Sequence, residues 1–99
     1  TFATTRYVVE FPQKPGMEQN SPNPFNPSTV IRYALPDQRF VRLSIYDALG
    51  RPVARLIDRV VPGGYHTVRW EAGSLPSGVY LYRLEAGDYV ETRKMLLLR

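Results

Sequence analysis

The sequence has no cysteine and only one histidine, and these absences remove most of the side chains that catalysis and metal binding use. Without cysteine there is no disulfide and no thiolate metal site, so packing alone must hold the fold. The histidine, His66, lies beside Val68 and Trp70, and no GxSxG, phosphate-loop or HExxH motif supplies it with a nucleophile or a metal partner. We therefore predict that the chain is not an enzyme and has no catalytic, cofactor-binding or metal-binding residues.

Long apolar runs are also absent. No stretch approaches the roughly 20 residues that a membrane helix needs, so we expect no transmembrane segment. The first ten residues lack the basic start and apolar stretch of a signal peptide, so any export signal of a parent protein is expected upstream of them. The net charge is +4, but the cations are scattered among nine carboxylates. This dispersion favours a solvated, mildly basic surface over a nucleic-acid footprint.

What the sequence has in quantity is proline, glycine and tyrosine, with nine, seven and seven residues in a chain of 99. These residues favour short strands and many turns, and the length allows one domain. Two prolines and a glycine interrupt residues 11–16, which is typical of a linker or a crossing loop. We expect residues 1–16 to be a linker or the end of a preceding domain, with one strand in residues 1–10, and the domain proper to span residues 17–99.

Apolar side chains alternate with polar ones along most of the domain, which is the period of a half-buried strand. Turn residues separate these segments at intervals of about 8–12 residues, as in an antiparallel sandwich. The pattern predicts an all-β, immunoglobulin-like antiparallel sandwich of about seven strands, with an edge strand that carries a bulge over residues 52–61. The predicted strands cover residues 29–35, 40–47, 52–61, 65–71, 79–86 and 89–98. The predicted core contains Ile31, Tyr33, Leu43, Ile45, Val68, Trp70, Tyr80, Tyr82 and Leu84.

A rigid loop with the sequence SPNPFNPS precedes the first of these strands. Proline fixes the backbone and removes N–H donors, whereas asparagine bonds nearby backbone groups. Phe25 is the only large apolar residue of this loop, so we expect it to close one end of the core. Asn23 and Asn26 are expected to satisfy buried backbone groups beside it.

Four segments, taken together, carry a family resemblance: QNSPNPFNPSTVIRYALP, YDALGRPVARL, GGYHTVRWEA and LPSGVYLYRLEAGDYVETRKMLLLR. In this order, over about residues 18–99, they resemble the C-terminal sorting domain of type IX secretion (the Por secretion system) in Bacteroidetes-type bacteria. The resemblance implies a seven-stranded immunoglobulin-like sandwich without catalytic activity. It also implies that the domain guides a larger parent, such as a secreted glycosidase or peptidase, to the cell surface or the medium through the periplasm and the outer membrane.

The partners implied by the resemblance are an outer-membrane translocon, a sortase-like peptidase that removes the domain and attaches the parent to the surface, and the covalently linked upstream domain. The resemblance singles out three groups of residues for sorting. Gly50 and Gly78 in these groups also have a purely structural explanation, because glycine adopts backbone angles that other residues avoid. The candidate residues are Asn23, Pro24, Phe25 and Asn26; Asp47, Gly50, Arg51, Gly78 and Tyr80; and Lys94, Met95, Leu96, Leu97, Leu98 and Arg99.

The last strand breaks the alternating pattern, because four apolar residues, 95–98, follow one another. One face of this strand therefore carries apolar side chains that a core does not require, or the strand is buried on both faces. In the first case the strand offers a partner an edge for β-augmentation and an apolar strip between Lys94 and Arg99.

Two other functions are consistent with the sequence. A carbohydrate-binding module would use exposed aromatic rings, and Tyr65 and Tyr89 are the best candidates because the other strand aromatics alternate in step with the core. A structural immunoglobulin-like spacer is the third alternative. A calcium site made from turn aspartates also stays open, although no DxDxDG-like spacing supports one.

Overall fold

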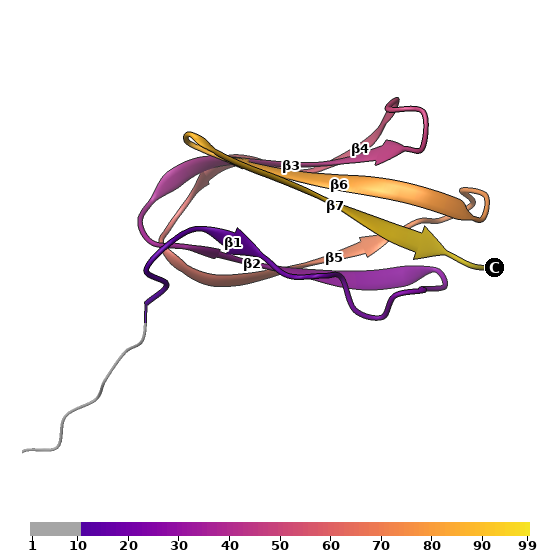
Figure 1. Ribbon diagram of the computed structural model, residues 1–99, viewed down its shortest axis with the longest axis horizontal. Helices are drawn as coiled ribbons and strands as arrows, with labels where there is room; N and C mark the ends of the chain where they lie inside the picture. The colour runs from indigo at the N-terminus through magenta and orange to yellow at the C-terminus, as the bar shows by residue number, and fades with distance from the viewer. Residues whose placement is uncertain (1–10) are drawn as a thin grey trace, which may run out of the picture.

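Two antiparallel sheets face each other in residues 11–99, the part of the chain that the computed structural model describes (Figure 1). One sheet has the strand order β1-β2-β5 and the other has the order β4-β3-β6-β7. The strands are β1 (Gly16–Met17), β2 (Ser28–Leu35), β3 (Arg39–Asp47), β4 (Pro52–Val61), β5 (Gly64–Glu71), β6 (Gly78–Ala86) and β7 (Tyr89–Leu97). This confirms the all-β sandwich and its seven strands. The strand expected in residues 1–10 lies outside the described residues.

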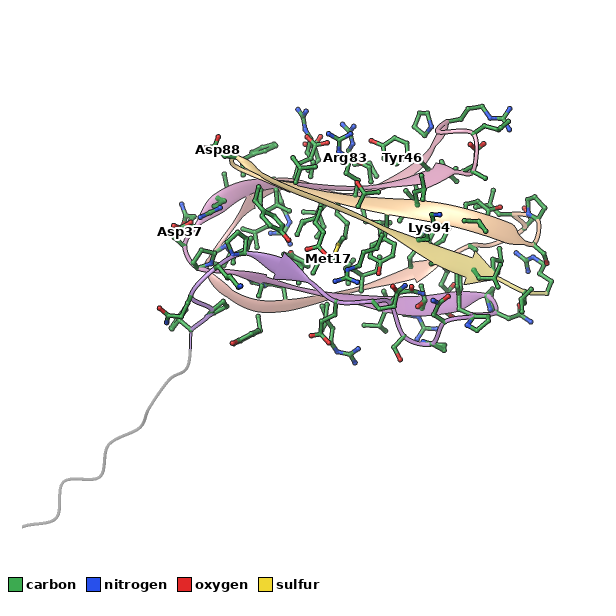
Figure 2. All side chains as sticks on the ribbon, in the orientation of Figure 1. Met17, Asp37, Tyr46, Arg83, Asp88 and Lys94 are labelled. Atoms are coloured by element: carbon green, nitrogen blue, oxygen red, sulfur yellow. The ribbon has the colours of Figure 1, made fainter. Side chains whose placement is uncertain are left out.

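The alternating sequence pattern places the core between the sheets, as predicted. Ile31 and Tyr33 on β2 and Tyr82 on β6 are almost completely buried, while the polar residues between them face outwards. Val68 is the exception among the predicted core residues, because it is only partly buried. It packs against the core from β5, at the edge of its sheet, and part of its side chain remains in water. Figure 2 shows Met17, from the short β1, between the two sheets.

Strand β4 is the irregular edge strand that the sequence predicts. Its register against β3 shifts between Leu43 and Ser44 and again between Ile45 and Tyr46. Strand β5, at the edge of the other sheet, pairs with β2 from Ser28 opposite Glu71 to Leu35 opposite Gly64 without a shift. The two edges therefore differ, since β4 is bulged and β5 is regular.

The connections divide between the two ends of the sandwich. Residues 18–27, the β3–β4 turn, the β5–β6 loop and the residues after β7 lie at one end, at the right of Figure 1. The β2–β3, β4–β5 and β6–β7 turns lie at the other end, where Figure 2 shows Asp37 and Asp88. Within residues 11–99 there is no helix long and apolar enough to cross a membrane.

Candidate recognition site

The residues that the family resemblance singles out come together at one end of the sandwich. They occupy the loop of residues 21–27, the β3–β4 turn, the start of β6 and the last residues of the chain. This convergence follows from antiparallel pairing, because Asp47 at the end of β3 lies opposite Tyr80 near the start of β6, and Gly78 lies opposite Leu97 at the end of β7. Segments separated by more than 70 residues therefore form one surface, which we call the motif end.

Phe25 closes the core at the motif end, as predicted. Its side chain is 2% exposed, and its ring centroid lies 5.7 Å from that of Trp70. Trp70 in turn meets Tyr80 in an edge-on contact at 6.0 Å. The hydroxyl of Tyr80 donates a hydrogen bond of 2.7 Å to the Pro76 carbonyl. This row of rings joins the loop, β5 and β6, so the loop is fixed by the core beneath it.

The same loop covers the outer edge of β7. The Phe25 N–H donates to the Leu96 carbonyl at 3.0 Å, and the Leu98 N–H donates to the Phe25 carbonyl at 3.1 Å. The Asn23 side-chain oxygen accepts the Leu96 N–H at 2.9 Å. The edge that the sequence suggested for β-augmentation is therefore occupied at this end of β7. A partner therefore has to contact the side chains here, because the backbone groups of this edge are already hydrogen-bonded to the loop.

Asn20 performs the buried role that the sequence analysis assigned to Asn23 and Asn26. Its backbone N–H donates to the Tyr82 hydroxyl at 2.8 Å, and its side-chain amide donates to Thr29 Oγ1 at 2.9 Å. Asn23 bonds a backbone group, as expected, but is itself exposed. Asn26 is exposed, and its side chain makes no hydrogen bond to any residue of 11–99. Asn20 lies outside the proline-rich run, and no local pattern distinguishes it from other polar residues.

Asp47 organises the β3–β4 turn. Its Oδ1 accepts the backbone N–H groups of Leu49 and Arg51, both at 2.9 Å, and its Oδ2 lies 2.7 Å from the Arg51 guanidinium. The hydrogen bond from the Arg51 backbone is the main reason why the pKa of Asp47 falls below its ordinary value, and the Arg51 side chain adds to the effect. Gly50 has φ +83°, which L side chains rarely adopt. The turn is therefore held in one shape by Asp47 and Gly50.

Arg99 holds the β5–β6 loop. Its backbone N–H donates to Ser77 Oγ at 2.9 Å, and its guanidinium donates to the carbonyls of Leu75, at 2.7 Å, and Gly73. Strand β7 ends at Leu97 rather than at the predicted residue 98, so this contact comes from the segment that follows the strand. It fixes the loop against β7.

Apolar side chains remain exposed on the motif end. Val79 and Leu96 lie opposite each other on β6 and β7, with Val79 41% exposed. Leu98 is 50% exposed and Leu49, at the tip of the β3–β4 turn, is 79% exposed. Met95 and Leu97 are buried, so the apolar run at the end of β7 alternates and is not buried on both faces. We call Leu49, Val79, Leu96 and Leu98 the apolar end patch.

A groove of about 340 Å³ lies beside the apolar end patch, between the β3–β4 turn and the β5–β6 loop. Leu49, Val53, Leu75 and Val79 line it with apolar groups. The exposed guanidinium of Arg51 also lines the groove, while Lys94 and Arg99 are exposed nearby on β7 and after it. The motif end thus combines apolar side chains with cations, as a protein-binding surface does.

The histidine, the carboxylates and the two candidate sugar-stacking tyrosines lie in surroundings that fit structural roles better than catalytic or metal-binding ones. His66 Nε2 lies 2.7 Å from the Pro62 carbonyl oxygen. The imidazole stacks on the Tyr33 ring, with the two ring centroids 5.2 Å apart. No group of three or more His, Cys, Asp or Glu residues within 11–99 is arranged to hold a metal ion. Tyr65 is 67% exposed, as expected for a sugar-stacking ring, but Tyr89 is partly buried. Burial and the neighbouring Glu91 raise the pKa of Tyr89 to about 12.

Comparison with known proteins matches the motif end to a family. Residues 21–98 match the model of the family described as "Secretion system C-terminal sorting domain". The match begins at the loop that covers β7 and includes the residues of the motif end up to Leu98. A search of the curated proteins found no match.

Proposed function

We propose, from the premise that the chain belongs to the secretion-system C-terminal sorting domain family, that its motif end is the surface through which a type IX secretion system recognises it. Membership makes the chain a sorting signal of an exported protein, carried to the cell surface or the medium, and a sorting domain is a signal rather than a catalyst. The finer assignments, namely the recognition surface, the partners and the parent, are our proposal.

The observation that carries the proposal is the apolar end patch. Leu49 at the tip of a turn and Leu98 beyond the end of a strand stabilise the monomer less than buried leucines do, because they remain 79% and 50% exposed to water. Fixed by Asp47, Phe25 and Arg99, they occupy a rigid surface that binds a partner without a large ordering cost. We infer that the outer-membrane translocon contacts this patch.

The parent protein is, in this proposal, a secreted hydrolase such as a glycosidase or a peptidase. A sortase-like peptidase then removes the domain and attaches the parent to the cell surface. The glycan-binding alternative is less favoured, since Tyr65 is the one exposed aromatic ring on the outer face of β2 and β5. A stacking platform for polysaccharides uses several such rings, and a single ring gives a sugar chain little to stack on.

The experiment places the 99-residue chain behind a signal peptide and a reporter, in a host with type IX machinery. We expect the intact fusion to reach the surface or the medium, and a fusion without residues 94–99 to stay in the periplasm. Because this truncation removes part of β7, a second variant separates folding from recognition. This variant is Leu98→Ser, directly after β7, and its matched control is Val90→Ser on β7, since both side chains are 50% exposed. Equal export of all four fusions would overturn the proposal.

A further inference from the structure

Within residues 11–99, strand β5 leaves one sheet edge without the protection that the other edges have. The outer edge of β7 is covered by the loop at Phe25, and the Arg93 side chain crosses to the Met17 carbonyl at 2.9 Å on the same side of the sandwich. Strand β4 begins with a proline and contains two register shifts, and β1 pairs through only two residues. Strand β5 has neither a bulge nor a proline nor a lysine, and it is eight residues long. Proteins normally disrupt such an edge, because it is a template for another strand.

The direction of the hydrogen bonds shows which groups the β5 edge offers. The Ala72 N–H donates to the Pro27 carbonyl at 2.9 Å, on the side of β2. Backbone N–H and C=O groups alternate in direction along an antiparallel strand, so those of the even-numbered residues of β5 point towards β2. The N–H and C=O groups of Tyr65, Thr67, Arg69 and Glu71 therefore point away from the sheet. The side chains of the same four residues are exposed on its outer face.

Three of these side chains, Tyr65, Thr67 and Arg69, are complementary to a second copy of themselves in antiparallel orientation. Arg69 and Glu71 carry opposite charges and pair at 3.0 Å within one chain. When two β5 strands pair around Thr67, each Thr67 lies opposite the other, and each Arg69 lies opposite the Tyr65 ring of the second copy. The threonine pair and the cation–π pair are both favourable across strands, and the two Arg69 side chains stay apart. A register centred on Arg69 would instead bring like charges together.

We propose that two copies of this domain associate through β5 and join their three-stranded sheets into one continuous sheet. The pairing forms about six backbone hydrogen bonds, two for each of the three pairs of outward-facing residues. The contact area is small, so the dimer is weak and forms at high local concentration, as on a surface. This association uses the edge of the three-stranded sheet, whereas the apolar end patch belongs to the four-stranded sheet. The dimer is therefore independent of the proposed recognition by the secretion system.

The test exploits proline at a position that donates no hydrogen bond within the chain. Thr67→Pro removes an outward N–H at the centre of the proposed contact and adds a ring there, while the pairing of β5 with β2 is retained. Thr92→Pro is the matched control, because Thr92 is an exposed threonine whose N–H also points outwards, in phase with Leu96 on β7. Analytical ultracentrifugation of the 99-residue chain over rising concentration should give twice the monomer mass for the wild type and for Thr92→Pro. Thr67→Pro should remain a monomer.

A second measurement keeps the proposal testable if proline unfolds the strand. The chain has no cysteine, so Thr67→Cys introduces a single thiol that meets only its counterpart in the second copy. Under mild oxidation we expect Thr67→Cys to form a disulfide-linked dimer at least tenfold faster than Thr92→Cys. A wild type that stays monomeric at the highest soluble concentration, a folded Thr67→Pro that still dimerises, or equal cross-linking of the two cysteine variants would each overturn the proposal.

Discussion

Phe25→Ala tests whether the loop of residues 21–27 is held by the core. The Phe25 side chain is 2% exposed and lies against Trp70, so its truncation leaves a cavity. The rigid prolines on either side prevent the loop from moving inwards to fill this cavity. Truncation of a buried phenylalanine costs about 3–5 kcal/mol, and about 4–8 °C of melting temperature per kcal/mol is usual for a domain of this size. We therefore expect the melting temperature to fall by at least about 12 °C.

The loss should also be visible at the edge of β7. The N–H groups of Leu96 and Leu98 donate to Asn23 and Phe25, so both should exchange with solvent faster in Phe25→Ala. Phe40→Ala is the matched control, because Phe40 is 49% exposed and its truncation should cost less than about 0.5 kcal/mol. Calorimetry and amide hydrogen exchange measure both effects. The reasoning fails if Phe25→Ala is as stable as Phe40→Ala, or if exchange at Leu96 and Leu98 is unchanged.

Three further predictions concern titration and chemistry. The pKa of Asp47 is lowered in the folded state from an ordinary value of 3.8, so its stabilising effect is complete above that pH and is lost as pH falls through the folded pKa. The difference in melting temperature between the wild type and Asp47→Ala should thus shrink in acid, and a constant difference would refute the assignment. The pKa of Tyr89, raised to about 12 by burial and by Glu91, should fall in Glu91→Gln by ultraviolet titration but stay above its ordinary value, because burial remains. His66→Gln should leave the activity of any attached parent enzyme unchanged; a turnover that this substitution abolishes would contradict the structural role of His66.

The strands and most of the core follow from the sequence, because alternation along a strand decides which side chains are buried. Residues such as Ile31, Leu43 and Tyr82 lie where period-2 patterning places them. Val68 shows the limit of this reasoning, since it shares the alternating pattern of β5 with the buried Trp70 but is itself only partly buried. Position in the sheet order is a tertiary property that a single strand's sequence does not contain.

The family resemblance selects the candidate residues, but the sequence does not predict the contacts that bring them together. Asn20 bonds the hydroxyl of Tyr82, 62 positions away, and the Asn23 side chain bonds the backbone of Leu96, 73 positions away. Contacts at such separations depend on how the two sheets are placed, and no local pattern encodes them. The sequence therefore does not predict that the loop at Phe25 occupies the edge of β7. It also does not predict that a partner has to contact side chains there instead of the backbone.

The most direct test of the central claim measures export of patch variants that remain folded. The double variant Leu49→Ser/Leu98→Ser removes the two most exposed side chains of the apolar end patch, while Phe40→Ser/Val90→Ser makes the same chemical change on two side chains of 49% and 50% exposure outside the patch. With cooperative melting verified for both, the fraction of reporter at the surface or in the medium is measured in a type IX host. The account predicts that the patch variant accumulates in the periplasm and that the control is exported like the wild type. Equal export of the two variants would contradict it.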